Sequence, residues 1–254
     1  MERQLPSAVS NASWSVKSLT DYHRVLLKLS GEALQANDGP LSAETLARVA
    51  RELAAARRER NFELAIVIGG GNIFRGLAGG SALGLDRTTG DQMGMLATLI
   101  NSLALRDALI AAGLPAEVHS AVHVGGVAPQ ISIPAARAAL AAGTVVLFAC
   151  GTGSPFFTTD TAAALRAAEI RADVLFKATK VDGVYSADPA RDPQAKRYDN
   201  IGYAEVLEKR LAVMDLTAIS FCMENKVPIC VFSMIEEGGI TKAVLGRASG
   251  TRVQ

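Results

Sequence analysis

The stretch TVVLFACGTGSPFFTTDTAAALRAAEI, residues 144–170, decides the fold of this chain. Its first seven residues form an uncharged apolar run that predicts a buried strand, and its last nine, rich in alanine, predict a helix. Glycines, a proline, two adjacent phenylalanines, threonines and Asp160 lie between them, in residues 151–161. Ligands bind in loops at the carboxyl ends of strands in open α/β sheets. We therefore expect this loop to hold a nucleotide-sized substrate, and Asp160 to orient phosphoryl-transfer chemistry.

Strand and helix patterns alternate along the rest of the chain. We predict further strands at residues 22–29, 64–68, 116–120, 173–178, 228–232 and 250–254, the last as a terminal edge strand. We predict helices at residues 43–60 after an N-cap at Ser42, and at 91–112, 133–142, 203–208, 215–225 and 239–245. Such alternation predicts a mostly parallel sheet covered on both faces. The fold class is therefore α/β, as a single three-layer α/β/α domain over residues 22–254. The Ser-rich residues 1–21 predict a flexible N-terminal extension.

Composition excludes several classes of protein. The net charge is +1 and no segment is dense in Lys or Arg, which argues against a nucleic-acid binder. The cysteines lack a CxxC pair and their number is odd, so we expect buried, reduced thiols and a cytoplasmic protein. The histidines show no metal-site spacing, so we expect no protein metal site. Residues 138–159 carry no charge, yet glycines and a proline divide them into a helix end, a strand and a loop rather than a membrane helix.

Two other predicted strand ends carry groups suited to phosphate. The motif KLSGE, residues 28–32, places Lys28 at the end of a buried strand, where it either snorkels to water or reaches a phosphate; the spacing favours neither. The run GGGNIFRG, residues 69–76, offers backbone amides and Arg75 to an anion, although a flexible turn is the alternative. Neither a dinucleotide-binding fingerprint nor a P-loop is present.

Three further features have two interpretations each. Asp91, at the expected start of a helix, is either an N-cap or an acceptor for a ligand hydroxyl. Phe156 and Phe157 either line a pocket for a flat base or pack in the core. Tyr185 and Asp188 follow an Asp-Gly turn signal that predicts a hairpin or a tight excursion, and both reach one ligand if this segment folds over the strand ends.

In a doubly wound sheet, the lysine, the glycine run and the Thr/Phe/Asp loop share one edge. Phosphoryl transfer requires mainly positioning and charge neutralisation, which a lysine and backbone amides supply. Asp160 would hold that lysine or coordinate Mg²⁺ indirectly. An acceptor phosphate or carboxylate is already ionised at neutral pH, so no general base is needed.

Together with the segments at residues 90–95, 152–160 and 177–189, these motifs resemble the bacterial uridylate (UMP) kinases of the amino acid kinase superfamily. The resemblance covers residues 22–254. It implies transfer of the γ-phosphoryl group of MgATP to UMP in pyrimidine nucleotide synthesis, with Lys28 and Asp160 as catalytic residues and Mg²⁺ carried by the nucleotide. It also implies a homohexamer that GTP activates and UTP inhibits. The implied ATP contacts are Lys28, Leu29, Ser30, Gly31, Gly71, Arg75, Thr179, Tyr185 and Asp188. The implied UMP contacts are Gly70, Asp91, Thr152, Gly153, Ser154, Pro155, Phe156, Phe157, Thr158 and Thr159.

The chain departs from the family pattern at three places. Ser154 stands where the family usually has Asn, residues 127–133 lack an acidic-aromatic pair, and residues 36–42 differ from the Gly-rich version associated with the response to GTP. Two other functions stay open. One is a kinase for another small anionic acceptor, and the other is a nucleotide-binding storage or regulatory protein on the same scaffold.

Overall fold

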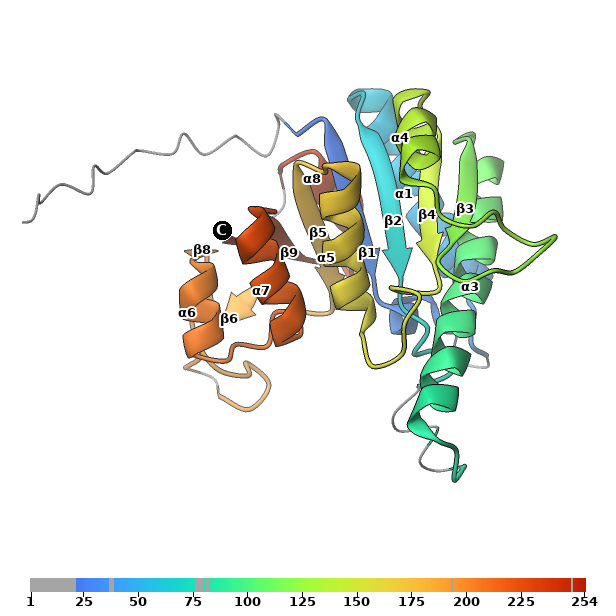
Figure 1. Cartoon of the computed structure of the whole chain (residues 1–254). Helices are drawn as coiled ribbons and strands as arrows, with labels where there is room; N and C mark the ends of the chain where they lie inside the picture. The colour runs from blue at the N-terminus through green and yellow to red at the C-terminus, as the bar shows by residue number, and fades with distance from the viewer. Residues whose placement is uncertain (1–21, 37–38, 76–79, 81–82, 193, 248) are drawn as a thin grey trace, which may run out of the picture.

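A computed structural model describes residues 22–36, 39–75, 80, 83–192, 194–247 and 249–254; the predicted extension, residues 1–21, lies outside them. The core is an eight-stranded sheet (Figure 1). Its strands follow in the order β3 (Ala116–Ser120), β4 (Val145–Ala149), β2 (Glu63–Ile68), β1 (Arg24–Leu29), β5 (Val174–Thr179), β9 (Ile229–Ser233), β10 (Thr251–Val253) and β8 (Asn200–Ile201). All neighbouring strands are parallel except β9 and β10.

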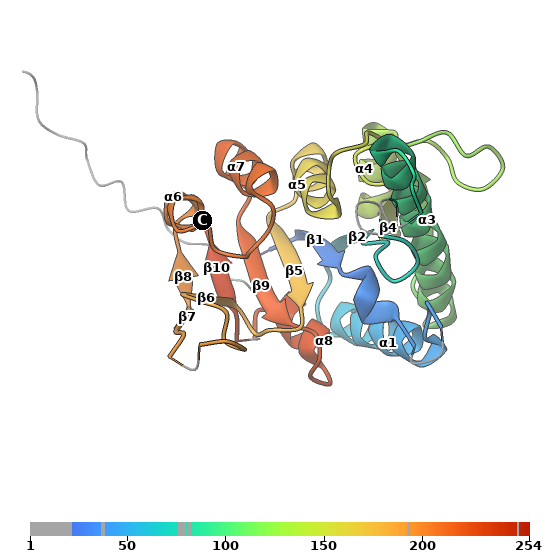
Figure 2. The ribbon, with the colours of Figure 1, turned by 90° about the horizontal axis from the view of Figure 1, so that it is seen from below.

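Helices cover both faces of this sheet. One hydrophobic core lies under α1 (Ala43–Glu59), α3 (Arg87–Ala111) and α8 (Gly239–Val244). The other lies under α4 (Ile133–Ala141), α5 (Thr159–Ile170), α6 (Tyr203–Glu208) and α7 (Leu216–Asn225). Figure 2, seen from below Figure 1, shows α5 and α7 on one side of the sheet and α1 and α8 on the other. The predicted single three-layer α/β/α domain is confirmed.

The central strands bring the site residues together. Within β1, Leu27 packs into one core and Leu26 into the other, so the strand is anchored on both faces. The residue that follows Leu27 in β1, Lys28, lies opposite Val67 of β2 and Lys177 of β5 in the parallel register. Two lysines on adjacent strands therefore share one level at the carboxyl ends of the sheet. A short 3₁₀ turn, η2 (Gly31–Leu34), follows β1 directly.

Most predicted elements are confirmed within one or two residues, and two predictions were wrong. Helix α3 begins at Arg87 with Asp86 as its N-cap, so Asp91 lies in its second turn. Strand β10 is not an edge strand, because the two-residue β8 pairs with its outer side. The Asp182–Gly183 signal marks a bend that leads into β6 (Val184–Tyr185). This strand pairs with the distant β7 (Arg197–Tyr198), so of the two predicted forms the segment is a tight excursion and not a hairpin.

Residues 138–159 divide as predicted into the end of α4, strand β4 and a loop. Among the described helices, α3 is long and apolar enough to cross a membrane by length and composition alone. In this fold its buried residues, including Leu99, Leu105 and Leu109, pack into the core beside α1 and β3. All three cysteines are buried and free, as predicted.

Candidate functional site

Asp160 joins the two lysines at the centre of the sheet edge. Its Oδ1 atom lies 2.8 Å from the Lys28 Nζ, and its Oδ2 atom lies 2.7 Å from the Lys177 Nζ. All three side chains are largely buried. The α5 backbone fixes the aspartate, because the N-cap Thr158 accepts hydrogen bonds from the amides of Asp160 and Thr161. A carboxylate in the first turn of a helix is also favoured by the helix dipole.

The charges of this cluster depend on one another. Burial alone would raise the pKa of Asp160, but the ion pairs with Lys28 and Lys177 outweigh it and hold that pKa below its ordinary value. Burial lowers the pKa of Lys177, an effect that Asp160 opposes. Within the cluster two ammonium groups face one carboxylate, and the Asp215 carboxylate also acts on Lys177 from outside it. Such a partly desolvated positive cluster is suited to a phosphoryl group that gains negative charge in a transition state.

A cavity of about 310 Å³ opens on one side of the cluster, and we call it the lysine cavity. Three lysines, Lys28, Lys177 and Lys180, line it against one acidic residue, Glu32, so its lining is positively charged. Ser30 and Thr179 of the predicted ATP site also line it. Its charge and volume suit a polyphosphate.

A second cavity, of about 200 Å³, lies against the loop that follows β4, and we call it the loop cavity. Its lining combines the glycine run, the start of α3 and the Thr/Phe loop: Gly70, Gly71, Phe74, Arg75, Asp91, Gly94, Met95, Thr98, Gly151, Thr152, Ser154, Phe157, Thr158 and Thr159. Thr159 lines this cavity, and the next residue, Asp160, pairs with two lysines that line the other, so Asp160 lies between the two cavities. This arrangement suits two ligands that exchange a group between them.

The glycine run is rigid because three segments approach closely there. A Cβ at Gly31 would lie 2.4 Å from the Gly69 carbonyl, and one at Gly70 would lie 2.7 Å from the Gly94 carbonyl of α3. The buried Asn101 donates a 2.6 Å hydrogen bond to the Gly69 carbonyl. These contacts favour a packed turn over the flexible turn that was the alternative.

Asp91 anchors the Thr/Phe loop to α3. Its Oδ2 atom accepts 2.8 Å hydrogen bonds from the Phe156 amide and from the Arg87 Nε. The Arg87 guanidinium also lies over the Phe156 ring, 5.3 Å from its centroid. Neither phenylalanine is in the core, because Phe156 is 66% exposed and Phe157 is 52% exposed. Asp91 is therefore not an N-cap, and the two phenylalanines do not pack in the core.

Ser154, the departure from the family pattern, is part of a local turn. The Thr152 hydroxyl accepts from the Ser154 amide at 3.2 Å and donates to the Ser154 carbonyl at 3.1 Å. The Thr152 side chain therefore supports the loop through backbone contacts, and the loop keeps its turn without using the Ser154 side chain.

Several predicted site residues line neither cavity. Leu29 is in the core, and its carbonyl accepts the Gly69 amide. The Tyr185 hydroxyl donates to Asp182 at 2.6 Å, and Asp188 pairs with the exposed Arg191. Those outside the linings of both cavities are Leu29, Gly31, Gly153, Pro155, Phe156, Asp160, Tyr185 and Asp188, although Asp160 pairs with two lysines of the lysine cavity.

Arg75, which lines the loop cavity, pairs with Glu32, which lines the lysine cavity. The same Glu32 carboxylate lies 3.4 Å from the Lys180 Nζ. A carboxylate therefore connects a cation of the loop cavity to a cation of the lysine cavity.

Sequence reasoning missed Lys177 and Asp215. Lys177 interrupts an apolar strand, as Lys28 does, and that shared pattern was the available signal. Asp215 caps α7 by accepting from the Ala218 amide, and it also accepts from the hydroxyls of Thr158 and Thr161. It thereby ties the start of α7 to the turn that carries Asp160. No feature of the sequence indicates this tertiary contact.

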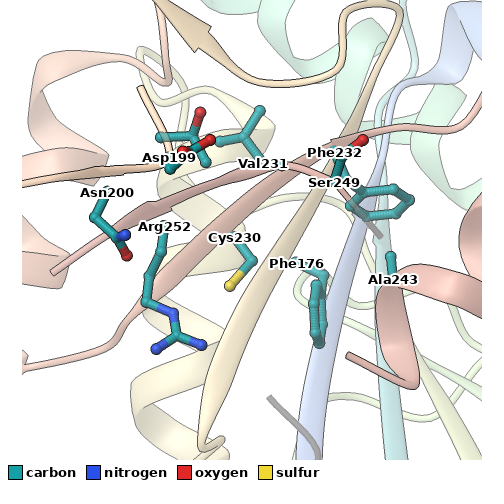
Figure 3. Close-up of a pocket in the computed structure, with 11 residues that line it drawn as sticks. Phe176, Asp199, Asn200, Cys230, Val231, Phe232, Ala243, Ser249 and Arg252 are labelled. Carbon is teal, nitrogen blue, oxygen red and sulfur yellow. The ribbon is translucent and has the colours of Figure 1, made fainter. Parts of the chain in front are cut away.

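A third cavity, of about 300 Å³, lies beside β9 and β10 (Figure 3). Phe176 and Phe232 meet edge to face in its wall, and Arg252 and Cys230 also line it. Burial raises the pKa of Cys230 to about 11, so its thiol stays protonated and unreactive near neutral pH. None of the predicted site residues lines this cavity.

Metal ligands do not gather in the part of the chain that the structure describes. No group of three His, Cys, Asp or Glu side chains is placed there to hold an ion. Each oxygen of Asp160 faces a lysine instead. The described side chains therefore do not form a metal cage of their own.

Known proteins resemble this chain in sequence and in fold. The sequence profile of the amino acid kinase family matches residues 23–233. The chain is similar to the UMP kinase from Ureaplasma parvum, with 34% identity and a TM-score of 0.87 over 91% of this chain and 98% of that one. It is similar to the UMP kinase from Bacillus anthracis, with 35% identity and a TM-score of 0.86 over 92% and 96%. An isopentenyl phosphate kinase, with 22% identity and a TM-score of 0.68 over 91% and 100%, shares the fold.

Proposed function

Because this chain belongs to the amino acid kinase family, and is therefore a transferase that phosphorylates a small molecule, we propose that it moves the γ-phosphoryl group of MgATP onto UMP, giving UDP and ADP. The observation that carries the proposal is the Lys28–Asp160–Lys177 cluster between two cavities. The two similar UMP kinases, each at least 34% identical, support UMP as the acceptor. The place in pyrimidine nucleotide synthesis and the cytoplasmic location stay predictions.

In this proposal the triphosphate of ATP occupies the lysine cavity and UMP occupies the loop cavity. Lys28 and Lys177 neutralise charge on the transferring group, and Asp160 holds both ammonium groups between the two cavities. The phosphate of UMP is ionised at neutral pH, so it attacks without a general base. No side chain therefore has to remove a proton.

Mg²⁺ would enter with ATP. In kinase sites this ion binds substrate phosphates and keeps several waters, with only one or two carboxylates from the protein. It supplies further charge neutralisation on the phosphates. The scarcity of grouped carboxylates in the described site is compatible with an ion that the nucleotide carries.

We predict that Asp91→Ala raises the KM for UMP about tenfold, the loss expected for hydrogen bonds to a charged acceptor, and leaves the KM for ATP within about twofold. The physical reason is that Asp91 holds both the Phe156 amide and Arg87 beside the loop cavity. Steady-state kinetics with each substrate varied in turn measure both constants. Asp107→Ala is the matched control, because Asp107 lies on the same helix and pairs with Arg106 away from the loop. Equal effects of the two substitutions would contradict the role of Asp91.

We also propose that the protein is a homo-oligomer. Helix α3 exposes four large apolar side chains along its length, each between 37% and 53% exposed: Met93, Leu96, Ile100 and Ile110. Such a row favours burial against another surface, and a second copy supplies the same row. The hexameric state, activation by GTP and inhibition by UTP stay predictions.

The oligomer is tested by replacing two of these residues, Leu96→Glu with Ile100→Glu. We expect the particle mass in analytical ultracentrifugation to fall to that of a smaller assembly, because carboxylates would be desolvated in the interface. Glu44→Gln on α1 serves as a control at an unrelated surface. An unchanged mass for the double variant would exclude α3 as the interface.

A further inference from the structure

Arg166 is a buried cation that the phosphoryl-transfer site does not use directly. It lies on α5, one to two turns after Asp160, and is only 6% exposed. Its Nη1 atom lies 2.5 Å from the Glu169 carboxylate. Its Nη2 atom faces the carbonyl oxygens of Gly151, at 3.5 Å, and Thr152, at 3.4 Å. These two carbonyls belong to the base of the loop that lines the loop cavity.

The loop needs such support because much of its backbone is left-handed. Cys150 and Gly151 both have φ of 61°, Gly153 has φ of 90° and Phe156 has φ of 71°. Positive φ costs free energy at Cys150 and Phe156, which are not glycines. Asp91 stabilises the far part of the loop through the Phe156 amide. Arg166 is the corresponding contact at its base.

A surface ion pair would not require this burial. An i,i+3 pair such as Arg166–Glu169 forms equally well in solvent, where neither group is desolvated. In this chain the guanidinium instead lies over the buried Phe148 ring, 6.0 Å from its centroid, and turns toward the loop carbonyls. A buried charge is retained at a cost that hydrogen bonds must offset. The Glu169 carboxylate supplies the shortest of those bonds, and the Gly151 and Thr152 carbonyls supply two longer ones.

We propose that Arg166 is a positioning residue for the acceptor nucleotide. The inference rests on the proposed function, in which the loop cavity holds UMP. Because a peptide unit is planar and trans, holding the Gly151 carbonyl toward α5 directs the Thr152 N–H to the opposite side of the chain. Arg166 thus sets the orientation of the peptide that precedes Thr152, a residue of the loop-cavity lining, without itself touching the ligand.

The test compares Arg166→Met with Arg137→Met. Arg137, on α4, is a matched control, because it also donates to a backbone carbonyl of α5, that of Glu169. For Arg166→Met we expect a rise of about tenfold in the KM for UMP, with kcat and the KM for ATP within about twofold, as for loss of a hydrogen bond to a charged group. Arg137→Met should leave all three constants unchanged. Arg166→Lys keeps the charge but not the planar fork, so it should give an intermediate KM for UMP.

Hydrogen exchange gives a second readout that does not depend on turnover. We expect the amides of residues 151–153 to exchange faster in Arg166→Met and not in Arg137→Met. If wild-type protein fails to phosphorylate UMP, the proposed function fails, whereas the exchange result still tests the contact. If wild type uses UMP but Arg166→Met or Arg166→Lys keeps its KM, or raises the KM for ATP equally, the positioning role is refuted. A rise in the KM for UMP that is as large in Arg137→Met as in Arg166→Met would also refute the positioning role.

Discussion

Replacing Lys28 by alanine is expected to lower kcat about 100- to 1,000-fold, the loss typical of one preorganised donor to transition-state charge. The KM for UMP should change little, because Lys28 lines the lysine cavity and not the loop cavity. The fold should persist, since Asp160 keeps Lys177 as its counter-ion. Steady-state kinetics with MgATP and UMP measure both constants.

Lys180→Ala is the control for this prediction. Lys180 lines the same cavity but is 70% exposed and pairs with Glu32, away from Asp160. Its loss should affect the KM for ATP more than kcat. Turnover of Lys28→Ala equal to that of wild type would remove Lys28 from the mechanism.

Replacing Asp160 by asparagine is expected to lower kcat by a similar factor, roughly 100-fold or more, while the protein remains folded. Asparagine matches the shape of aspartate and keeps its place in the first turn of α5, but it no longer attracts Lys28 and Lys177. Loss of a buried counter-ion is usually severe for folding. Here burial lowers the pKa of Lys177, and Asp160 is the main group that opposes this effect. Lys177 keeps its hydrogen bond to the Val213 carbonyl in the variant, which limits the destabilisation.

Kinetics and thermal unfolding, measured on the same preparation, check this prediction. Asp173→Asn is a suitable control, because Asp173 accepts the amides of His23 and Arg24 at the opposite end of the sheet. It should lower the unfolding temperature and leave kcat unchanged. If Asp160→Asn instead collapses the unfolding temperature and keeps its rate, Asp160 serves only to begin α5.

The sheet could be predicted from the sequence because its central strands are buried on both faces. Residues 64–68 and 144–150 are continuous apolar runs, and the structure places β2 and β4 there. Strand β8 could not be predicted, since two residues are too few to show a period, and its pairing with β10 joins segments distant in the sequence. The start of α3 was predicted at Asp91 instead of Arg87, because glycine disfavours a helix interior, yet the helix contains Gly90 as a buried residue.

Only those residues of the candidate site that stand out locally in the sequence could be predicted. Lys28 and Asp160 each stood out at the end of a predicted strand or the start of a predicted helix. Lys177 lies beside Lys28 because β1 and β5 are neighbours in the sheet. The order of the strands was not predicted, so this contact was missed. Tyr185 and Asp188 follow a turn signal, but a turn signal does not show in which direction the chain continues after the turn. In the structure β6 pairs with β7, and neither residue lines a cavity at the cluster.

The most direct test of the central claim is acceptor specificity. Purified wild-type protein is incubated with MgATP and, in parallel, UMP, CMP or N-acetylglutamate, and the phosphorylated products are quantified. We predict rapid formation of UDP, a strong preference for UMP over CMP, and no reaction with the carboxylate acceptor. Folded protein that makes no UDP, or that phosphorylates N-acetylglutamate instead, would contradict the assignment. Equal use of UMP and CMP would make the loop cavity a general pyrimidine site.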